Sequence, residues 1–332
     1  ISGVTKTATY DEQDRLRTWG TKTYSYNDAG ELTGVSDSSA SPAAVTTYTY
    51  DVFGNMKSAT LPSGLQVTYL LDGQSRRVAR SVGGVLQKQF VWFDSTRLGA
   101  ELNSSGAIVS QFIYGLKGNT PDYIIKGSTK YKVITDHLGS VVAVVNSSSG
   151  AVAQRLEYDE FGRVLVDTSP GFQPFGFAGG LYDTDTKLTL FGARSYDAEV
   201  GRWVSKDPIL FAGGDANLYG YVLNDPVNWV DPEGLKFSTG VWRTVQGLGH
   251  IALLTGTVAV GAVVAEGFLA EGSVAGFRTA IAVSGAAGGY FAYRALDRFV
   301  DAYNEFRNQG DSDFSFSSTH TSTTQNASSK CP

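Results

Sequence analysis

The sequence has few of the residues that build disulfide, metal and nucleic-acid sites. Its 332 residues include one cysteine and three histidines. The single cysteine, Cys331, permits neither an internal disulfide nor a cysteine metal cluster. His137, His250 and His320 lie far apart without ligand spacing, so we expect no metal site and no cofactor. The formal net charge of −5 lacks the basic excess of nucleic-acid-binding surfaces, so we expect no nucleic-acid partner.

Two further signals are missing. Residues 1–19 contain no basic stretch followed by an apolar one, so no signal peptide is expected there. The chain begins in the middle of a repeat, and we expect it to be a piece of a longer one. No phosphate-binding Gly-x-x-x-x-Gly-Lys-Ser/Thr loop is found, and Gly83-Gly84 and Gly213-Gly214 are expected to form turns.

Charged residues make up only 18% of the chain, whereas glycine and tyrosine are abundant, with 39 and 17 copies. This composition is typical of all-β proteins with tight turns and aromatic cross-strand pairs. A Tyr-Asp or Tyr-x-Asp pair, usually followed by Gly, recurs along the first half. The copies lie at residues 10–11, 26–30, 50–54 and 158–162, with looser versions at 71–73 and 136–139.

Each repeat predicts a strand, a turn and a second strand. Alternating β-branched and aromatic residues, as in 46–50 and 87–92, are typical of strands. In the turn, Asp accepts local backbone hydrogen bonds and Gly takes a positive φ. One such hairpin cannot bury its apolar face alone, so the repeats are expected to join into a continuous sheet. A single Tyr-Asp pair would indicate only an ordinary hairpin, but its recurrence favours a repeat.

The composition changes twice after the repeats. Residues 171–235 are rich in aromatic residues and glycine without a clear period, which predicts a compact cap. Further on, 244–265 and 279–293 carry no charge and are dominated by Gly and Ala. Residues 297–303 have helical spacing of apolar residues, and the polar tail from 308 is expected to be disordered.

Several unusual strings occur in order in the second part of this region. They are DHLGSV at 136–141, YDEFG at 158–162, GARSYD at 192–197, GRWVSKDP at 201–208, NLYGYV at 217–222 and NDPVNWVDPEGL at 224–235. Together they resemble the RHS-repeat-associated core domain, and residues 1–165 resemble YD repeats. The resemblance covers residues 1–235.

This resemblance implies a large β-shell of spiralling YD-repeat strands that encloses a hollow. It also implies that the core domain closes the shell as a plug and acts as an aspartic autoprotease, and that the segment behind it is a variable toxin held inside. The wider family includes bacterial RHS and type VI effectors, insecticidal Tc toxin C components and animal teneurins. Two departures stand out. Ile209-Leu210 follows the first Asp-Pro where the family often has Ile-Gly, and the repeats are too few to close a shell.

Hydrolysis of a peptide bond by carboxylates needs two of them near one water, one ionised and one protonated. Like charges held close cannot both ionise, which separates their pKa values. Asp207 and Asp231, each followed by Pro, are the candidates for this pair. The resemblance implies the same pair and adds Arg194, whose guanidinium would orient one carboxylate and lower its pKa.

The scissile bond would be the one between Leu235 and Lys236, where the Asp-Pro-Glu-Gly-Leu string ends. Gly234 would let the backbone approach the carboxylates without a Cβ in the way. Two alternatives stay open: the Asp-Pro pairs are only turns, or Asp215 takes part in the chemistry. Asp225, in a third Asp-Pro pair, is expected to lie in a turn.

Three interpretations of the C-terminal segment compete. Residues 244–265 are long enough to span a bilayer, and 279–293 contain a Gly-x-x-x-Gly pattern, so one interpretation is a helical hairpin that inserts into a target membrane. A second is a pair of Gly/Ala helices that pack inside the shell or lead to a toxin. A third is a catalytic toxin, which has little support because residues 236–332 contain no nuclease, deaminase or transferase string.

We therefore predict an all-β YD-repeat shell with a core plug domain, followed by a mainly α-helical Gly/Ala-rich segment. The segments are YD/RHS repeats at 1–165, the autoprotease plug at 166–235, a helical effector segment at 236–307 and a polar tail at 308–332. The expected function is an RHS-family toxin-delivery shell that encapsulates its C-terminal effector and releases it by self-cleavage. The alternative is a structural or adhesion RHS protein at a cell surface, without cleavage.

The expected partners follow from this function. They are the chain's own C-terminal segment inside the shell, an immunity protein, a component of a secretion machine and a target membrane. The protein is expected to be secreted or delivered into target cells as a bacterial effector, and to lie at the cell surface in the alternative.

Overall fold

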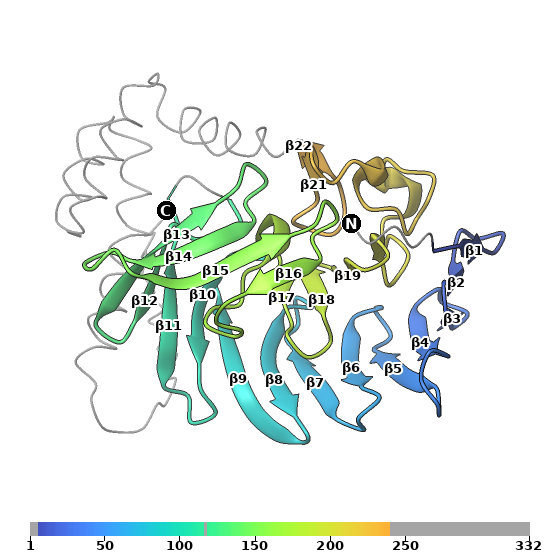
Figure 1. The fold of residues 1–332 in the computed structure, drawn as a ribbon, viewed down its shortest axis with the longest axis horizontal. Helices are drawn as coiled ribbons and strands as arrows, with labels where there is room; N and C mark the ends of the chain where they lie inside the picture. Colours follow the sequence, from blue (N-terminus) through green and yellow to red (C-terminus); the bar gives the residue numbers. More distant parts are fainter. Residues whose placement is uncertain (1–5, 116–117, 240–332) are drawn as a thin grey trace, which may run out of the picture. The chain divides into compact units, whose positions relative to one another are not determined.

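The computed structural model describes residues 6–115 and 118–239. Sixteen strands form one antiparallel sheet in which each strand pairs with the next along the chain (Figure 1). The all-β fold predicted for the repeats and the plug is confirmed. Of the helical segment predicted at 236–307, residues 236–239 are described, and Ser238–Thr239 form a short strand there instead of a helix. The rest of that segment and the polar tail, together with His250, His320 and Cys331, lie outside the described residues. Within the described part of the chain, no helix is long and apolar enough to cross a membrane.

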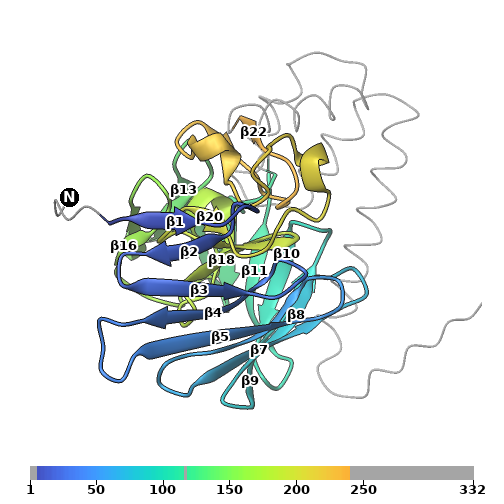
Figure 2. The ribbon, with the colours of Figure 1, turned by 90° about the vertical axis from the view of Figure 1, so that its right-hand side faces the viewer.

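The sixteen strands, called the repeat sheet here, are short and are joined by tight turns. Figure 2 shows β1 to β5 one after another along one curved sheet. In chain order the strands are β1 (Ala8–Tyr10), β2 (Leu16–Trp19), β3 (Lys22–Tyr26), β4 (Leu32–Asp37), β5 (Ala44–Tyr50), β6 (Met56–Thr60), β7 (Gln66–Leu71), β8 (Arg77–Val82), β9 (Val85–Trp92), β10 (Leu98–Leu102), β11 (Ile108–Ile113), β12 (Tyr123–Lys126), β13 (Thr129–Thr135), β14 (Val141–Asn146), β15 (Val152–Tyr158) and β16 (Val164–Asp167).

An aspartate at the end of a strand fixes the repeat turn. After β5, Asp51 Oδ1 accepts hydrogen bonds from the backbone N–H groups of Phe53 and Asn55, both at 2.9 Å. Gly54 has a φ of +84°, and its N–H donates to the Asp51 carbonyl oxygen at 3.2 Å. Because all these bonds are local, the same turn can recur wherever the sequence does. The carboxylate makes the same pair of bonds in four further turns, at Asp11, Asp72, Asp136 and Asp159.

After β16 the chain folds into a plug, defined here as residues 168–239, which consists of two small sheets and three short 3-10 helices. The strands β17 to β20 form a four-stranded antiparallel sheet, and β21 pairs with β22. The elements are η1 (Phe177–Gly179), β17 (Leu181–Tyr182), β18 (Leu188–Phe191), β19 (Arg194–Asp197), β20 (Arg202–Trp203), η2 (Leu210–Gly213), η3 (Val222–Asn224), β21 (Trp229–Val230) and β22 (Ser238–Thr239).

Five buried aromatic side chains form the centre of the plug, namely Phe177, Phe191, Tyr196, Trp203 and Tyr221. The ring centroids of Tyr196 and Tyr221 lie 4.4 Å apart, and Trp203 lies edge-on to them at 5.7 and 5.3 Å. Burial of one such side chain stabilises a fold by roughly 1.5–3 kcal/mol. Since the rings come from five separate segments, they hold together strands that are too short to be stable alone.

The plug and the repeat sheet share one apolar cluster and several backbone contacts. Leu188 and Val204 of the plug pack among buried side chains of β2 to β7. The Leu32 N–H donates to the Val204 carbonyl oxygen at 2.8 Å, and the Tyr219 hydroxyl donates to the Gly30 carbonyl oxygen at 2.8 Å. The plug is therefore positioned by the sheet.

Strand β8 adds a buried ion pair to this contact. Arg80 Nε and Nη2 donate to Asp183 Oδ2 and Oδ1 at 2.8 and 3.0 Å, and Arg80 also pairs with Asp185. The Tyr69 hydroxyl donates to Asp183 Oδ2 at 2.7 Å. Burial alone would raise the pKa of Asp183, but the bonds from Arg80 and Tyr69 lower it to about 2.

We expect Arg80→Ala to lower the free energy of unfolding at pH 7 by about 3–5 kcal/mol, because it leaves the Asp183 carboxylate buried and unpaired. The pKa of Asp183 lies below its usual value of 3.8, so the stabilisation is present above pH 4 and declines as the pH falls toward 2. Urea unfolding at pH 7 and pH 3 measures this. Arg155→Ala, which removes an exposed pair with Glu157, is the control and should cost less than about 1 kcal/mol. Equal losses for both variants would contradict the prediction.

Candidate active site

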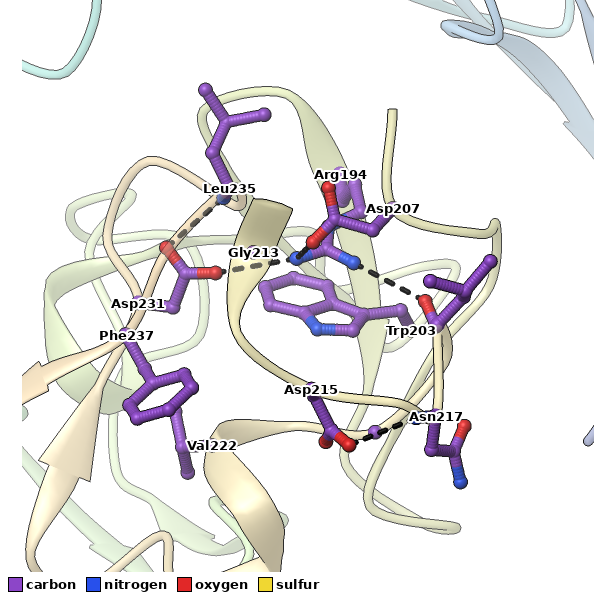
Figure 3. Close-up of a pocket in the computed structure, with 12 residues that line it drawn as sticks. Arg194, Trp203, Asp207, Gly213, Asp215, Asn217, Val222, Asp231, Leu235 and Phe237 are labelled. Atoms are coloured by element: carbon purple, nitrogen blue, oxygen red, sulfur yellow. Dashed lines mark hydrogen bonds and ion pairs between the residues drawn. The ribbon is translucent and has the colours of Figure 1, made fainter. Parts of the chain in front are cut away.

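A small cavity in the plug brings together the residues that the sequence predicts for cleavage (Figure 3). Its volume is about 20 Å³, which is enough for one water molecule. Arg194, Asp207, Asp231 and Leu235 line it. The three charged side chains belong to residues that are 4%, 6% and 3% exposed, so they face one another away from bulk solvent.

Arg194 begins strand β19 and lies at the centre of the site. Its Nη2 contacts Asp207 Oδ2 at 2.9 Å and Asp231 Oδ2 at 3.3 Å. Its Nε donates to the Gly234 carbonyl oxygen at 2.6 Å. The guanidinium carbon lies 4.1 Å from the centre of the Trp203 ring, which supports the planar group from one side. One guanidinium therefore joins both Asp-Pro segments to the end of the plug (Figure 3).

Asp207 is fixed by the turn that follows it. Its N–H donates to the Leu218 carbonyl oxygen at 3.0 Å, and its Oδ1 accepts from the Ile209 N–H at 2.9 Å. Oδ2 is the oxygen that faces Arg194. The Ile209-Leu210 departure from the family pattern falls in this turn, where Leu210 has a φ of +53° at the start of η2.

Asp231 holds the backbone on both sides of the predicted scissile bond. Its Oδ1 accepts hydrogen bonds from the N–H groups of Leu235 and Lys236, both at 3.1 Å. Immediately beyond, the Phe237 ring packs edge-on against Trp229 with centroids 5.5 Å apart, and β22 pairs with β21. The carboxylate thus contacts the nitrogen atom that a cut between Leu235 and Lys236 would release.

Two glycines allow the backbone to close tightly around the site. A Cβ on Gly213 would lie 2.6 Å from Asp207 Oδ2 and 3.0 Å from the Leu235 carbonyl oxygen. The distance between Asp207 Oδ2 and the Leu235 carbonyl oxygen therefore cannot exceed the sum of these two distances. Gly234 has a φ of +65°, and a Cβ there would lie 2.3 Å from the Phe191 carbonyl oxygen. Gly234 thus makes room for strand β18, whereas the sequence predicted that it makes room for the carboxylates.

Burial and charge act in opposite directions on the two carboxyl groups. Burial raises the pKa of Asp207 and of Asp231, and the positive charge of Arg194 opposes this rise. At Asp231 the N–H groups of Leu235 and Lys236 also lower the pKa, whereas the negative charge of Asp207 raises it. Burial lowers the pKa of Arg194, and the two carboxylates oppose that effect. A carboxyl group in this site therefore keeps its proton more readily than a carboxyl group exposed to water.

The remaining sequence candidates occupy different positions. Asp215 lines the same cavity, and its Oδ1 accepts from the Asn217 N–H at 2.8 Å. Both carboxylate oxygens of Asp225 accept from the Asn228 side-chain amide, at 2.8 and 3.1 Å, as in a turn. His137 Nε2 lies 2.8 Å from the Val227 carbonyl oxygen.

Sequence reasoning missed three contributors to the site. Trp203 supports Arg194, and Gly213 lies between Asp207 and Leu235. Trp203 belongs to the GRW string that ends four residues before Asp207, so its position was a usable signal. The third contributor comes from the repeat sheet. Arg77 of β8 contacts Ser195 of β19, the residue next to Arg194, and nothing local in the sequence indicates this contact.

We expect Arg194→Ala to lower the free energy of unfolding by about 3–5 kcal/mol at pH 7, because two buried carboxylates lose their common cation. Without Arg194 the pKa of both carboxyl groups rises further, so protonation removes their charge more readily as the pH falls and the loss at pH 4 should be smaller than at pH 7. Urea unfolding at the two pH values tests this. A loss that is the same at pH 4 and pH 7 would show that the charges do not determine the effect.

The chain is similar to several known proteins. The teneurin YD-shell family model matches residues 2–227. Teneurin-3 of Danio rerio is 31% identical over 234 residues, which are 66% of this chain and 8% of that protein. Teneurin-1 of Gallus gallus is 30% identical over 248 residues, which are 71% of this chain and 8% of that protein. The chain thus spans less than a tenth of the length of these relatives.

Similarity also extends to a bacterial protein and to solved structures. The tRNA3(Ser)-specific nuclease WapA of Bacillus spizizenii is 29% identical over 226 residues, which are 63% of this chain and 10% of that protein. The crystal structure of TcdB2-TccC3 matches with a TM-score of 0.45 and 18% identity, over 69% of this chain and 16% of that chain. Since the family model covers more than half of the sequence and the repeat sheet has the expected topology, the chain is an RHS/YD-repeat shell protein that belongs to the teneurin YD-shell family.

Proposed function

We propose that the chain is part of a toxin-delivery shell that cuts itself between Leu235 and Lys236 by an aspartic mechanism. The observation that carries the proposal is the pair of buried carboxylates, Asp207 and Asp231, which share Arg194 Nη2 beside that bond. Asp231 also contacts the Lys236 nitrogen.

In the proposed reaction, Asp207 is ionised and Asp231 is protonated. Asp207 takes a proton from a water molecule in the cavity, and the water oxygen bonds to the Leu235 carbonyl carbon. The bond from that carbon to the Lys236 nitrogen then breaks, and Asp231 donates its proton to the leaving amine. The products are a Leu235 carboxyl group and a Lys236 amino group, and the shared proton has moved from Asp231 to Asp207.

The electrostatics of the site support one proton shared between the two carboxyl groups. Burial raises the pKa of both carboxyl groups above the usual value, which favours a proton on one of them. Arg194 stabilises the remaining negative charge, whichever oxygen carries it. The proton can therefore move between the two groups without leaving a charge unpaired.

The fragment beginning at Lys236 is the effector in this proposal, and the shell encloses it. The similarity to the WapA nuclease supports a toxin-like role for the longer protein. Secretion or delivery into a target cell, an immunity protein, a secretion-machine component and a membrane target belong to the same proposal. The predicted membrane-active residues 244–265 and 279–293 lie outside the described residues.

A second candidate is a structural or adhesion protein at a cell surface whose chain stays intact. The similarity to teneurins, at 30–31% identity over about two thirds of the chain, favours it. The two candidates differ in a single measurable property, because only the first produces a fragment that begins at Lys236.

We expect intact-mass analysis of the purified chain to show two species that meet at the Leu235–Lys236 bond. Asp207→Asn and Asp231→Asn should each leave one uncut chain, because an amide can neither take up the water proton nor donate to the amine. Asp225→Asn, which changes the third Asp-Pro pair, is the matched control and should be cut like the unchanged chain. Cleavage in either of the first two variants would remove that aspartate from the mechanism, and a block by Asp215→Asn would bring Asp215 into it.

We expect Gly213→Ala to slow self-cleavage by roughly two orders of magnitude, since its Cβ would collide with both Asp207 Oδ2 and the Leu235 carbonyl oxygen. Gly213 does not have a positive φ, so the backbone tolerates alanine there. The appearance of the Lys236 fragment after dilution from denaturant gives the rate. Gly73→Ala in a repeat turn, where φ is not positive and a Cβ would meet nothing within 4 Å, controls for general effects on folding. Equal cleavage rates for the two variants would mean that cleavage does not require Asp207 Oδ2 to lie close to the Leu235 carbonyl oxygen.

A further inference from the structure

Strand β19 is held between two different surfaces. Successive side chains of a strand point to opposite faces, so Arg194 and Ser195 point in opposite directions. Arg194 faces the cavity that contains Asp207 and Asp231, and Ser195 faces a second cavity between the plug and the repeat sheet. Contacts that Ser195 makes on the opposite face of β19 therefore restrict the position of Arg194.

The contact behind the strand comes from the repeat sheet. Arg77 of β8 donates from Nη2 to Ser195 Oγ at 3.0 Å, and its guanidinium lies 3.8 Å from the centre of the Tyr69 ring. The Trp92 ring N–H donates to the Arg77 carbonyl oxygen at 2.7 Å. Arg77 and Ser195 are 7% and 5% exposed. A buried arginine that is fixed by stacking on its own sheet thus ends on the strand that carries Arg194.

Polar side chains line the second cavity, as they line the first. Its volume is about 10 Å³, and Tyr50, Arg77 and Ser195 line it together with Gly192 and Ala193. The buried Tyr50 hydroxyl has no hydrogen-bond partner among the described residues. On its other side the same segment of chain faces the cleavage string, because the Ala193 N–H donates to the Glu233 carbonyl oxygen at 2.9 Å. The repeat sheet and the scissile segment therefore contact opposite sides of the backbone at residues 192–195.

We propose that Arg77 and Ser195 are positioning residues for self-cleavage, through which the repeat sheet sets the place of Arg194. The inference rests on the proposed function and adds a condition to it. Cleavage then proceeds at full rate only when β8 of the repeat sheet is docked on the plug. An undocked plug keeps its two aspartates but loses the fixed position of the arginine that they share.

The test compares rates of formation of the Lys236 fragment after dilution from denaturant. Ser195→Ala and Arg77→Met should each slow cleavage at least tenfold, and the double variant should be no slower than the slower single one, because both remove the same bond. Ser195→Thr keeps the hydroxyl and should restore most of the rate. Arg76→Met changes the neighbouring arginine, which is bound to Asp72 within its own turn, and should not alter the rate.

Full-rate cleavage by Ser195→Ala, or independent multiplying effects of the two changes, would overturn the proposal. A second measurement does not depend on cleavage. In chains that carry Asp207→Asn, hydrogen exchange of the Arg194 Nε–H, which donates to Gly234, should become at least tenfold faster with Arg77→Met and stay unchanged with Arg76→Met. If the unchanged protein is never cut, the proposed function fails, while this exchange still decides whether Arg77 positions Arg194. Unchanged exchange in Arg77→Met would refute the positioning role.

Discussion

The plug depends on one guanidinium group buried between two carboxylates. Arg194 contacts Asp207 in one turn, and Asp231 and the Gly234 carbonyl oxygen in another. Two carboxylates that are almost fully buried repel each other, and burial of an unpaired charge costs several kcal/mol. The turns can therefore meet only around a cation. The same arrangement that closes the plug also buries both carboxyl groups and so raises the pKa of each, which means that structure and proposed chemistry have a common cause.

The repeat sheet and the plug are stabilised in different ways. In the sheet, every strand pairs with its neighbour in sequence, and five of the turns are fixed by an aspartate that bonds to residues two and four positions ahead. In the plug, strands of two to four residues are held by aromatic packing and by contacts with the sheet, such as Arg80 with Asp183. The pairs that build the sheet are close in sequence, whereas the contacts that hold the plug join residues far apart in sequence.

This difference explains what could be predicted from the sequence. The turns at Asp11, Asp51, Asp72, Asp136 and Asp159 were predictable because their bonds are local, and the family strings indicated Arg194, Asp207 and Asp231. The contact of Arg77 with Ser195 spans 118 residues and that of Arg80 with Asp183 spans 103, and no periodicity encodes either. Gly213 looked like part of a turn, and only the approach of Asp207 Oδ2 to the Leu235 carbonyl oxygen shows why a side chain does not fit there.

The geometry around the Leu235–Lys236 bond also bears on how much catalysis the site has to provide. The bond is held before the reaction starts, since Asp231 contacts both of its flanking N–H groups, Arg194 contacts Gly234 O, and β22 pairs with β21 just beyond. Fixing reacting groups in this way is worth effective concentrations on the order of 10⁵–10⁸ M in well-oriented intramolecular reactions. No substrate has to enter, so a cavity with room for one water is sufficient. Because each chain presents this bond once, the proposed site needs accurate positioning more than a high turnover rate. The contact of Arg77 with Ser195, which fixes the strand that carries Arg194, therefore matters as much as the two aspartates.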